Sequence, residues 1–166
     1  CNNFKNKIKY LHNNKIILVD INENNFLINN TFKKIYFIDV NSYQTEKYPA
    51  TAILPTIRDW KANYFNELTD WYSFAVITFQ MFIGIHPYRG DHPDFQDSKT
   101  SLKERVLKNV SVFNKKTQLP TVCLPFNVIP KNYLDWYYQI FEEGKRLPPP
   151  EDSFVNITIV PNIVKL

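Results

Sequence analysis

Residues 69–84 have the sequence TDWYSFAVITFQMFIG, and this segment sets the expected architecture of the chain. Thr69 belongs to the residue types that cap the N-terminus of a helix, and Gly84 is the residue type at which helices commonly end. Between them, large apolar side chains occur on every side of a helix. Because a helix that is apolar all round must be covered by other elements, we expect a central buried helix over residues 70–83.

Shorter elements are expected before this helix. Apolar residues recur at helical spacing from Phe4 to Leu11, which predicts a helix over residues 4–12. The short apolar runs that predict strands are residues 16–19, 26–28 and 35–38. The last two runs flank an Asn29-Asn30 turn, so they are expected to pair as a β hairpin.

Residues 41–68, which precede the central helix, show no clean period, and this predicts a long loop of the kind that often carries function.

Two further helices are expected after the central one. Ser101 and Glu104 form a capping-box pattern, and Pro130 and Gly144 bracket a third helical segment. We therefore predict an α+β fold that is mainly α with short β hairpins, built around the central buried helix.

Length and composition indicate one packed domain. The chain has 166 residues, of which 44% are hydrophobic and 16% aromatic, so a substantial core is expected. We assign residues 1–150 to this domain and residues 151–166 to a C-terminal tail or linker. Only three glycines occur, which argues against a glycine-rich phosphate loop within the chain.

Charge, cysteine content and hydropathy limit the classes of partner and the cellular compartment expected for the chain. The formal net charge is +4 and the lysines are scattered, so nucleic-acid binding is not favoured. Two cysteines make no disulfide framework, and a reducing cytoplasm is the simpler expectation. The longest apolar run, residues 74–85, falls short of the roughly 20 residues of a membrane span, so no membrane partner is expected.

Three oxygen-bearing residues stand where short apolar runs give way to polar loops. Asp20 follows the first run, Asn25 lies just before the second, and Asp39 follows the third. Carboxylate and amide oxygens are the ligands that Mg²⁺ prefers. A carboxylate in the same cleft could orient an attacking hydroxyl. Taken one by one, such residues are more often simple turn formers.

Their order and spacing resemble those of the protein-kinase family. Residues 18–28, LVDINENNFLI, resemble the catalytic loop, in which Asn follows the catalytic Asp by five positions. Residues 35–41, IYFIDVN, resemble the strand and the Asp-Phe-Gly motif. Residues 70–76, DWYSFAV, resemble the buried helix that begins Asp-x-Trp-Ser, residues 84–88 resemble Gly-x-x-Pro-Phe, and residues 145–148 resemble the Arg-Pro near the end of the lobe.

This resemblance covers about residues 4–150. Within the family, the sequence is most similar to a divergent bacterial and phage kinase-like group. It implies the C-terminal, catalytic lobe of a kinase, with ATP and Mg²⁺ as cofactors. Asp20 would be the catalytic base or orienting group, with Asn25 beside it in the catalytic loop. Asn25 and Asp39 would bind the Mg²⁺ that bridges the ATP phosphates. Asp70 would hold the catalytic-loop backbone, and Arg146 would be a structural ion-pair partner.

Several features depart from the family pattern. Residues 18–19 replace the His-Arg before the catalytic Asp, so switching by phosphorylation is not expected. Asn22 stands where kinases have a lysine near the transferring phosphate. Leu54-Pro55 is a loose counterpart of Ala-Pro-Glu, which leaves Arg146 without its usual glutamate. The N-lobe that covers ATP is missing from these residues and would have to come from upstream or from another chain.

Three functions remain open from the sequence. The first is phosphoryl transfer from Mg-ATP to Ser or Thr of a protein substrate, once an N-lobe completes the site. The second is an inactive pseudokinase, acting as a structural or interaction module in a larger assembly such as a virus particle, which would make it a virion component. The third is a metal-dependent nuclease that uses Asp20, Glu23 and Asp39.

Overall fold

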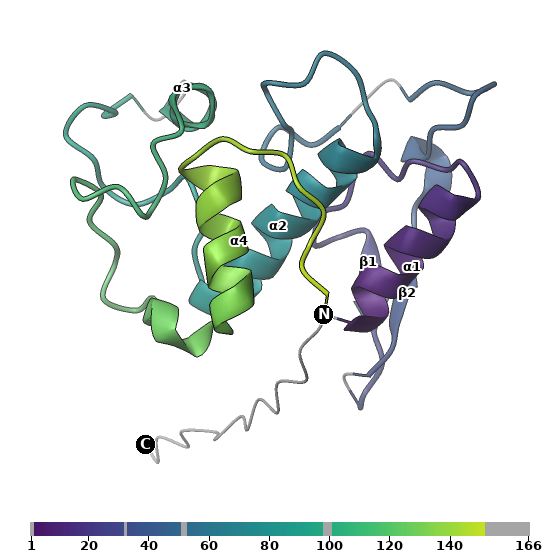
Figure 1. Ribbon diagram of the computed structural model, residues 1–166, viewed down its shortest axis with the longest axis horizontal. Coiled ribbons are helices and arrows are strands. Elements are labelled where there is room, and N and C mark those ends of the chain that lie inside the picture. The colour runs from purple at the N-terminus through teal and green to yellow at the C-terminus, as the bar shows by residue number, and fades with distance from the viewer. Residues whose placement is uncertain (1, 32, 51–52, 98–100, 152–166) are drawn as a thin grey trace.

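The computed structural model describes residues 2–31, 33–50, 53–97 and 101–151 (Figure 1). The elements along the chain are α1 (Asn2–Asn13), β1 (Phe26–Ile28), β2 (Ile35–Phe37), the 3-10 helix η1 (Val40–Ser42), α2 (Glu67–Ile83), α3 (Ser101–Lys108), the 3-10 helix η2 (Phe126–Val128) and α4 (Lys131–Phe141). β1 and β2 form an antiparallel hairpin in which Phe26 pairs with Phe37. The predicted fold class, mainly α with a short hairpin, is confirmed. The tail predicted for residues 151–166 lies outside the described residues except for Glu151.

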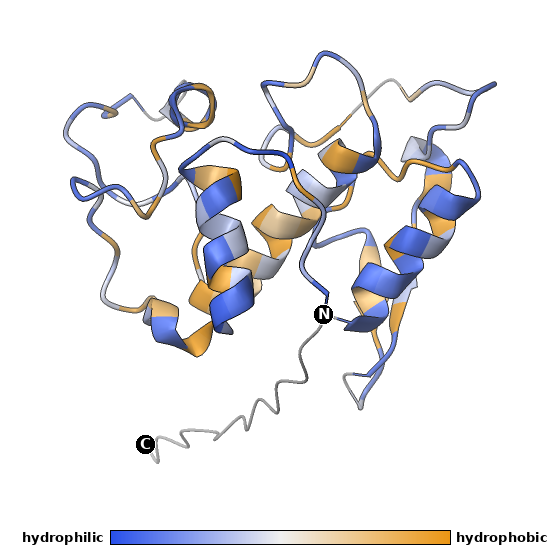
Figure 2. Ribbon diagram, viewed as in Figure 1, coloured by the Kyte–Doolittle hydropathy of each residue, from blue (hydrophilic) through white to orange (hydrophobic). Residues whose placement is uncertain are grey.

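Helix α2 is the buried centre of the fold, as its sequence predicts. Figure 1 shows it between α4 on one side and α1 with the hairpin on the other. Every residue from Thr69 to Phe79 is buried. The prediction was wrong for the last turn, where Met81 is 58% exposed. In Figure 2, strongly hydrophilic colour is frequent along α1 and α4 and rare along the middle of α2.

The start of α2 differs from the sequence prediction. The cap is Asn66, whose side chain accepts hydrogen bonds from the backbone N–H groups of Leu68 and Thr69. Thr69 completes a capping box from inside the helix, because its hydroxyl accepts a bond from the Asn66 N–H. The helix therefore begins three residues earlier, while its end at Gly84, which has φ +85°, is as predicted.

Aromatic rings join α2 to its neighbours on both sides. The Phe79 ring lies 5.3 Å from Tyr137 and 5.6 Å from Phe141, both on α4 and both edge-on. Toward the other side, Phe74 packs edge-on against Phe4 of α1 with the ring centroids 5.2 Å apart. Such pairs add to the free energy gained by burial alone. Both halves of the domain are thus anchored on one helix.

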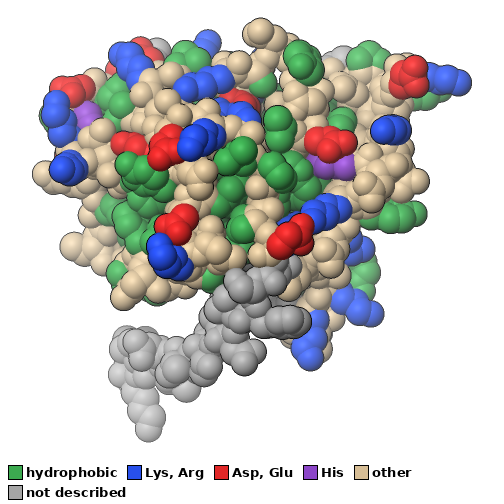
Figure 3. Space-filling model, viewed as in Figure 1, with side chains coloured by type: hydrophobic (Ala, Val, Ile, Leu, Met, Phe, Trp, Pro, Cys, Tyr) green, Lys and Arg blue, Asp and Glu red, His purple; other side chains and the backbone are tan. Residues whose placement is uncertain are grey.

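The described surface bears on the sequence-based expectations about membranes and nucleic acids. Among the described residues, no helix has the length and the hydrophobicity to cross a membrane. On the face shown in Figure 3, Lys and Arg side chains are interspersed with Asp and Glu. This face carries mixed charge, as the scattered lysines of the sequence predict.

Two substitutions on the same helix test the central position of α2. We expect Phe79→Ala to lower the free energy of unfolding by roughly 3 to 5 kcal/mol, because it removes a fully buried ring. Met81→Ala, two residues away and largely exposed, should change it by about 0.5 kcal/mol. Urea denaturation of both variants measures the difference, and equal effects would contradict the buried centre.

Candidate functional site

The buried carboxylate of Asp70 holds the backbone segment that precedes Asp20, the first residue of the candidate site. Asp70 is fully buried, and its two oxygens accept the backbone N–H groups of Leu18 at 2.8 Å and Val19 at 2.9 Å. His12 of α1, also buried, hydrogen-bonds the same carboxylate through Nε2 at 2.8 Å. Three donors compensate the cost of burying this charge. The expected bond between Asp70 and the loop backbone is present.

Val19 adopts a strained conformation under this hold. Its φ is +67°, in the left-handed region that β-branched residues avoid, and its side chain is 1% exposed. Such a conformation costs about 1–3 kcal/mol and persists only where the surroundings enforce it. The strand predicted for residues 16–19 is therefore wrong: only Ile17 forms a bridge, to Gln44, because Asp70 takes the next two N–H groups.

Asp20 and Asn25 are brought together directly after this strained residue. The Asn25 amide nitrogen donates to the Asp20 backbone carbonyl at 2.9 Å and to its carboxylate at 3.2 Å. Because Nδ2 makes both bonds, the Asn25 Oδ1 is left without a hydrogen-bond partner in the described part of the chain. The other carboxylate oxygen of Asp20 accepts the Leu54 backbone N–H at 2.9 Å. Asp20 is thus oriented by two polar contacts, one on each oxygen.

The β hairpin brings Asp39 near Asn25 through the backbone. The Ile38 N–H donates to the Asn25 carbonyl at 3.0 Å, which continues the pairing of β1 with β2. The strand ends at Phe37 rather than at Asp39. Asp39 is exposed with φ +55°, and its Oδ1 accepts a hydrogen bond from Asn41 at 3.2 Å. Both Asn25 and Asp39 therefore keep one side-chain oxygen that could serve a cation.

A small recess collects part of the predicted site. Asp20, Asn22 and Asn25 line it together with Tyr43 and neighbouring apolar side chains. Burial, and after it the negative charge of Asp70, raises the pKa of Tyr43 to about 12. The Asp39 side chain does not line this recess. In the described residues, no group of three His, Cys, Asp or Glu side chains could share a metal ion. The magnesium pair Asn25 and Asp39, one amide and one carboxylate, stays a prediction.

A loop formed by residues 53–60 covers Asp20 and is anchored from several sides. Leu54 contacts Asp20 directly, and two positions later the Thr56 carbonyl accepts a 2.7 Å bond from Nε2 of buried His86. The next carbonyl, that of Ile57, accepts the hydroxyl of Ser73 on α2 at 3.0 Å. The loop that the sequence left without structure is therefore fixed to the core by buried polar groups.

Asp59 is the ion-pair partner of Arg146, which the sequence interpretation missed. Arg146 binds both of its carboxylate oxygens, with Nη2 donating to Oδ1 at 2.7 Å, and stacks over the Tyr72 ring at 4.5 Å. Burial opposes the charged form of Arg146, but the bond to Asp59 outweighs it, so the pKa of Arg146 lies above its usual range. Arg146 thus has a carboxylate partner. The available signal was that Asp59 is the one acidic residue between Pro55 and Asn66.

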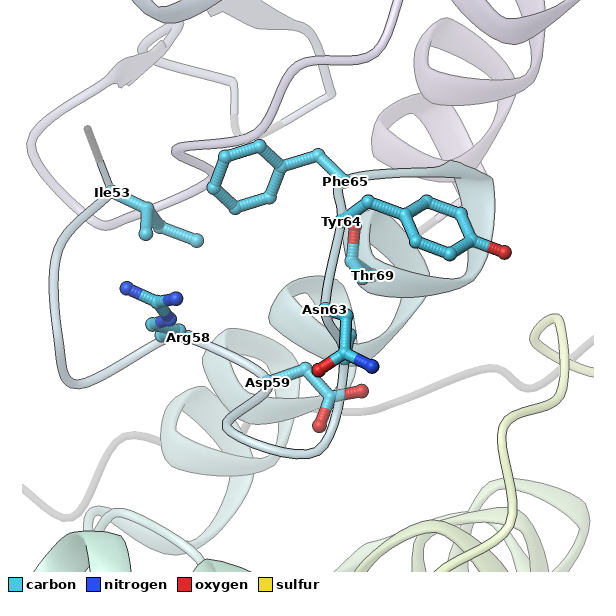
Figure 4. A pocket seen from close by; sticks show the side chains of 8 residues that line it. Ile53, Arg58, Asp59, Asn63, Tyr64, Phe65 and Thr69 are labelled. Carbon is cyan, nitrogen blue, oxygen red and sulfur yellow. The ribbon is translucent and has the colours of Figure 1, made fainter. Parts of the chain in front are cut away.

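A second, larger recess opens beside the same loop (Figure 4). Its cavity volume is about 90 Å³. Figure 4 shows Ile53 and Arg58 on one side and Phe65 and Asn63 on the other. The sequence did not indicate a concave surface here.

The chain matches no protein-family model and no curated protein. The resemblance of residues 4–150 to a kinase catalytic lobe therefore stays a prediction from its motifs. The contacts of Asp20, Asn25 and Asp70 are the observations on which a proposal of function can be built.

The buried His86 predicts a pH dependence of stability. Burial lowers its pKa from 6.5 to about 4, against the opposing effect of its bond to Thr56, and the charges of Arg89 and Arg105 lower it further. Between pH 6.5 and pH 4 the unfolded chain binds a proton here that the folded chain does not. Stability should therefore fall as the pH falls through this window, by roughly 3 kcal/mol in total for this group.

His86→Asn, which can still donate to Thr56 but does not titrate, isolates this contribution. We expect the difference in free energy of unfolding between the wild type and the variant to change with pH between 4 and 6.5 and to be constant above 7. Urea denaturation at several pH values measures it. Parallel curves for the two proteins across this range would show that His86 is not held neutral.

Proposed function

We propose that the chain is the catalytic lobe of a divergent protein-kinase-like enzyme that transfers phosphate from Mg-ATP to Ser or Thr of a protein. The observation that carries this proposal is the strained Val19, held by the buried Asp70 immediately before Asp20. Strain of this kind is concentrated at functional sites, where it fixes the direction of a side chain.

Asp20 suits the role of orienting a substrate hydroxyl. Its carboxylate is half-buried and its direction is fixed by bonds from Asn25 and Leu54. A hydroxyl that bonded the same carboxylate would be aligned for attack on a phosphate placed beside it. Displacement of the Leu54 N–H would free the oxygen for this purpose. Asp20 would thus act by position more than by basicity.

Asn25 and Asp39 suit the role of holding Mg²⁺ together with phosphate oxygens. Each keeps one side-chain oxygen that accepts no hydrogen bond from the described residues, and the hairpin links their backbones. Hard oxygen donors are the ligands that Mg²⁺ selects. When bound, Mg-ATP would supply the transferable phosphate and neutralise the charge that develops on it. An N-lobe, upstream or on another chain, would complete the site.

A second candidate is an inactive pseudokinase that serves as a structural or interaction module in a larger assembly. It is favoured by the coverage of Asp20, since Leu54 and Asn25 occupy both carboxylate oxygens. Asn22, where kinases have a lysine, is 4% exposed and accepts a bond from Asn24. In this case the protein would be a virion component, whereas the enzyme would act in the cytoplasm.

Phosphate transfer by the full-length protein tests the first candidate. We expect Mg²⁺-dependent transfer of the γ-phosphate to a protein acceptor, and a loss of at least about 100-fold in kcat for Asp39→Asn and for Asp20→Asn. Asp135→Asn, an exposed aspartate on α4 paired with Lys131, is the matched control and should leave kcat unchanged.

The outcomes separate the two candidates. A rise in melting temperature with Mg-ATP that Asp39→Asn removes, without transfer to any acceptor, would favour a nucleotide-binding pseudokinase. No thermal shift and no transfer would contradict the enzyme and leave the structural module.

A further inference from the structure

We propose that the recess beside the covering loop binds an acidic side chain of a protein partner, with Arg58 as the residue that selects it. The inference rests on the proposed function in one respect: the partner segment would be the substrate whose hydroxyl meets Asp20. It goes further by assigning a charge preference and the residue responsible. The recess is lined by Ile53, Arg58, Asp59, Asn63 and Phe65 among others.

The recess lies next to the candidate catalytic carboxylate. Ile53, on its wall, directly precedes Leu54, whose N–H donates to Asp20 at 2.9 Å. An extended peptide advances about 3.3 Å per residue. A residue within a few positions of the acceptor hydroxyl would therefore reach the recess while the hydroxyl lies at Asp20.

Arg58 is the charged residue of the recess that is left without an acidic partner among the described residues. Arg58 has no carboxylate within ion-pair distance in the part of the chain that the structure describes. Its guanidinium lies 4.8 Å from the Trp60 ring centroid, and Lys103 lies 4.7 Å from the same centroid. Asp59, which also lines the recess, is paired with Arg146 through both carboxylate oxygens. The unpaired guanidinium of Arg58 therefore favours an incoming anion.

The recess also has an apolar component. Ile53 and Phe65 provide apolar surface on opposite sides of the recess (Figure 4). A side chain with an aliphatic stem and a terminal carboxylate, as in Glu, matches this combination.

Binding of labelled peptides to the full-length protein without ATP tests the assignment. The probes are fluorescent 11-residue peptides with a central Ser, a Gln background and one Glu placed in turn at each of the three positions on either side. We expect at least one Glu peptide to bind about tenfold more tightly than the all-Gln parent by fluorescence anisotropy. Arg58→Gln should reduce this preference to less than twofold, and Arg58→Lys should retain part of it.

Lys115→Gln, which removes an exposed positive charge elsewhere, is the control and should leave the preference intact. Melting temperatures of the Arg58 variants verify that they are folded. Equal binding of Glu and Gln peptides, or a preference that survives Arg58→Gln, would overturn the assignment. Tighter binding of a single-stranded oligonucleotide that displaces the peptide would also overturn it, in favour of a nucleic-acid ligand.

This assay does not depend on phosphate transfer. If transfer fails while Glu peptides are still preferred, the recess stands and the enzyme proposal falls. If Asp39-dependent transfer is observed without any Glu preference, only the recess assignment is overturned.

Discussion

Asp70 places a negative charge in the centre of the protein, and the geometry of the candidate site depends on what that charge binds. Its carboxylate receives two successive backbone N–H groups, of Leu18 and Val19, and the ring of His12. An unpaired buried charge would be prohibitively costly, so these donors are obligatory. The consequence is local: the chain must pass through a left-handed residue at Val19 before it reaches Asp20. Core packing of α2 and the direction of Asp20 are therefore coupled.

Buried polar groups also fix the covering loop, on the other side of Asp20. Buried polar side chains from distant parts of the chain hold residues 53–60: His86 binds Thr56, Ser73 binds Ile57 and Arg146 binds Asp59. None of these contacts forms regular secondary structure. They give an irregular segment a defined position, which loops at functional sites require. The recess beside the loop is held by the same contacts, so its shape is preorganised for binding a partner.

Sequence patterns predicted the elements whose signal is local. The buried helix, the hairpin and the end of α2 at Gly84 follow from apolar periodicity and turn residues, and they are confirmed. The strand predicted up to Val19 failed because a carboxylate 51 residues away takes its N–H. The pairing of Asp59 with Arg146 joins residues 87 positions apart, so the acidic residue is visible in the sequence but its partner is not, and the recess at Arg58 has no local signal. The roles of the site residues remain predictions, since geometry alone does not test chemistry.

Amide hydrogen exchange at Leu18 and Val19 tests the central claim most directly. If Asp70 holds these two N–H groups, both should exchange slowly in the wild type, and Asp70→Asn should accelerate them by about 100-fold while core amides of α2 such as that of Phe79 change far less. Rapid exchange of Leu18 and Val19 in the wild type, or rates that Asp70→Asn leaves unchanged, would contradict the account.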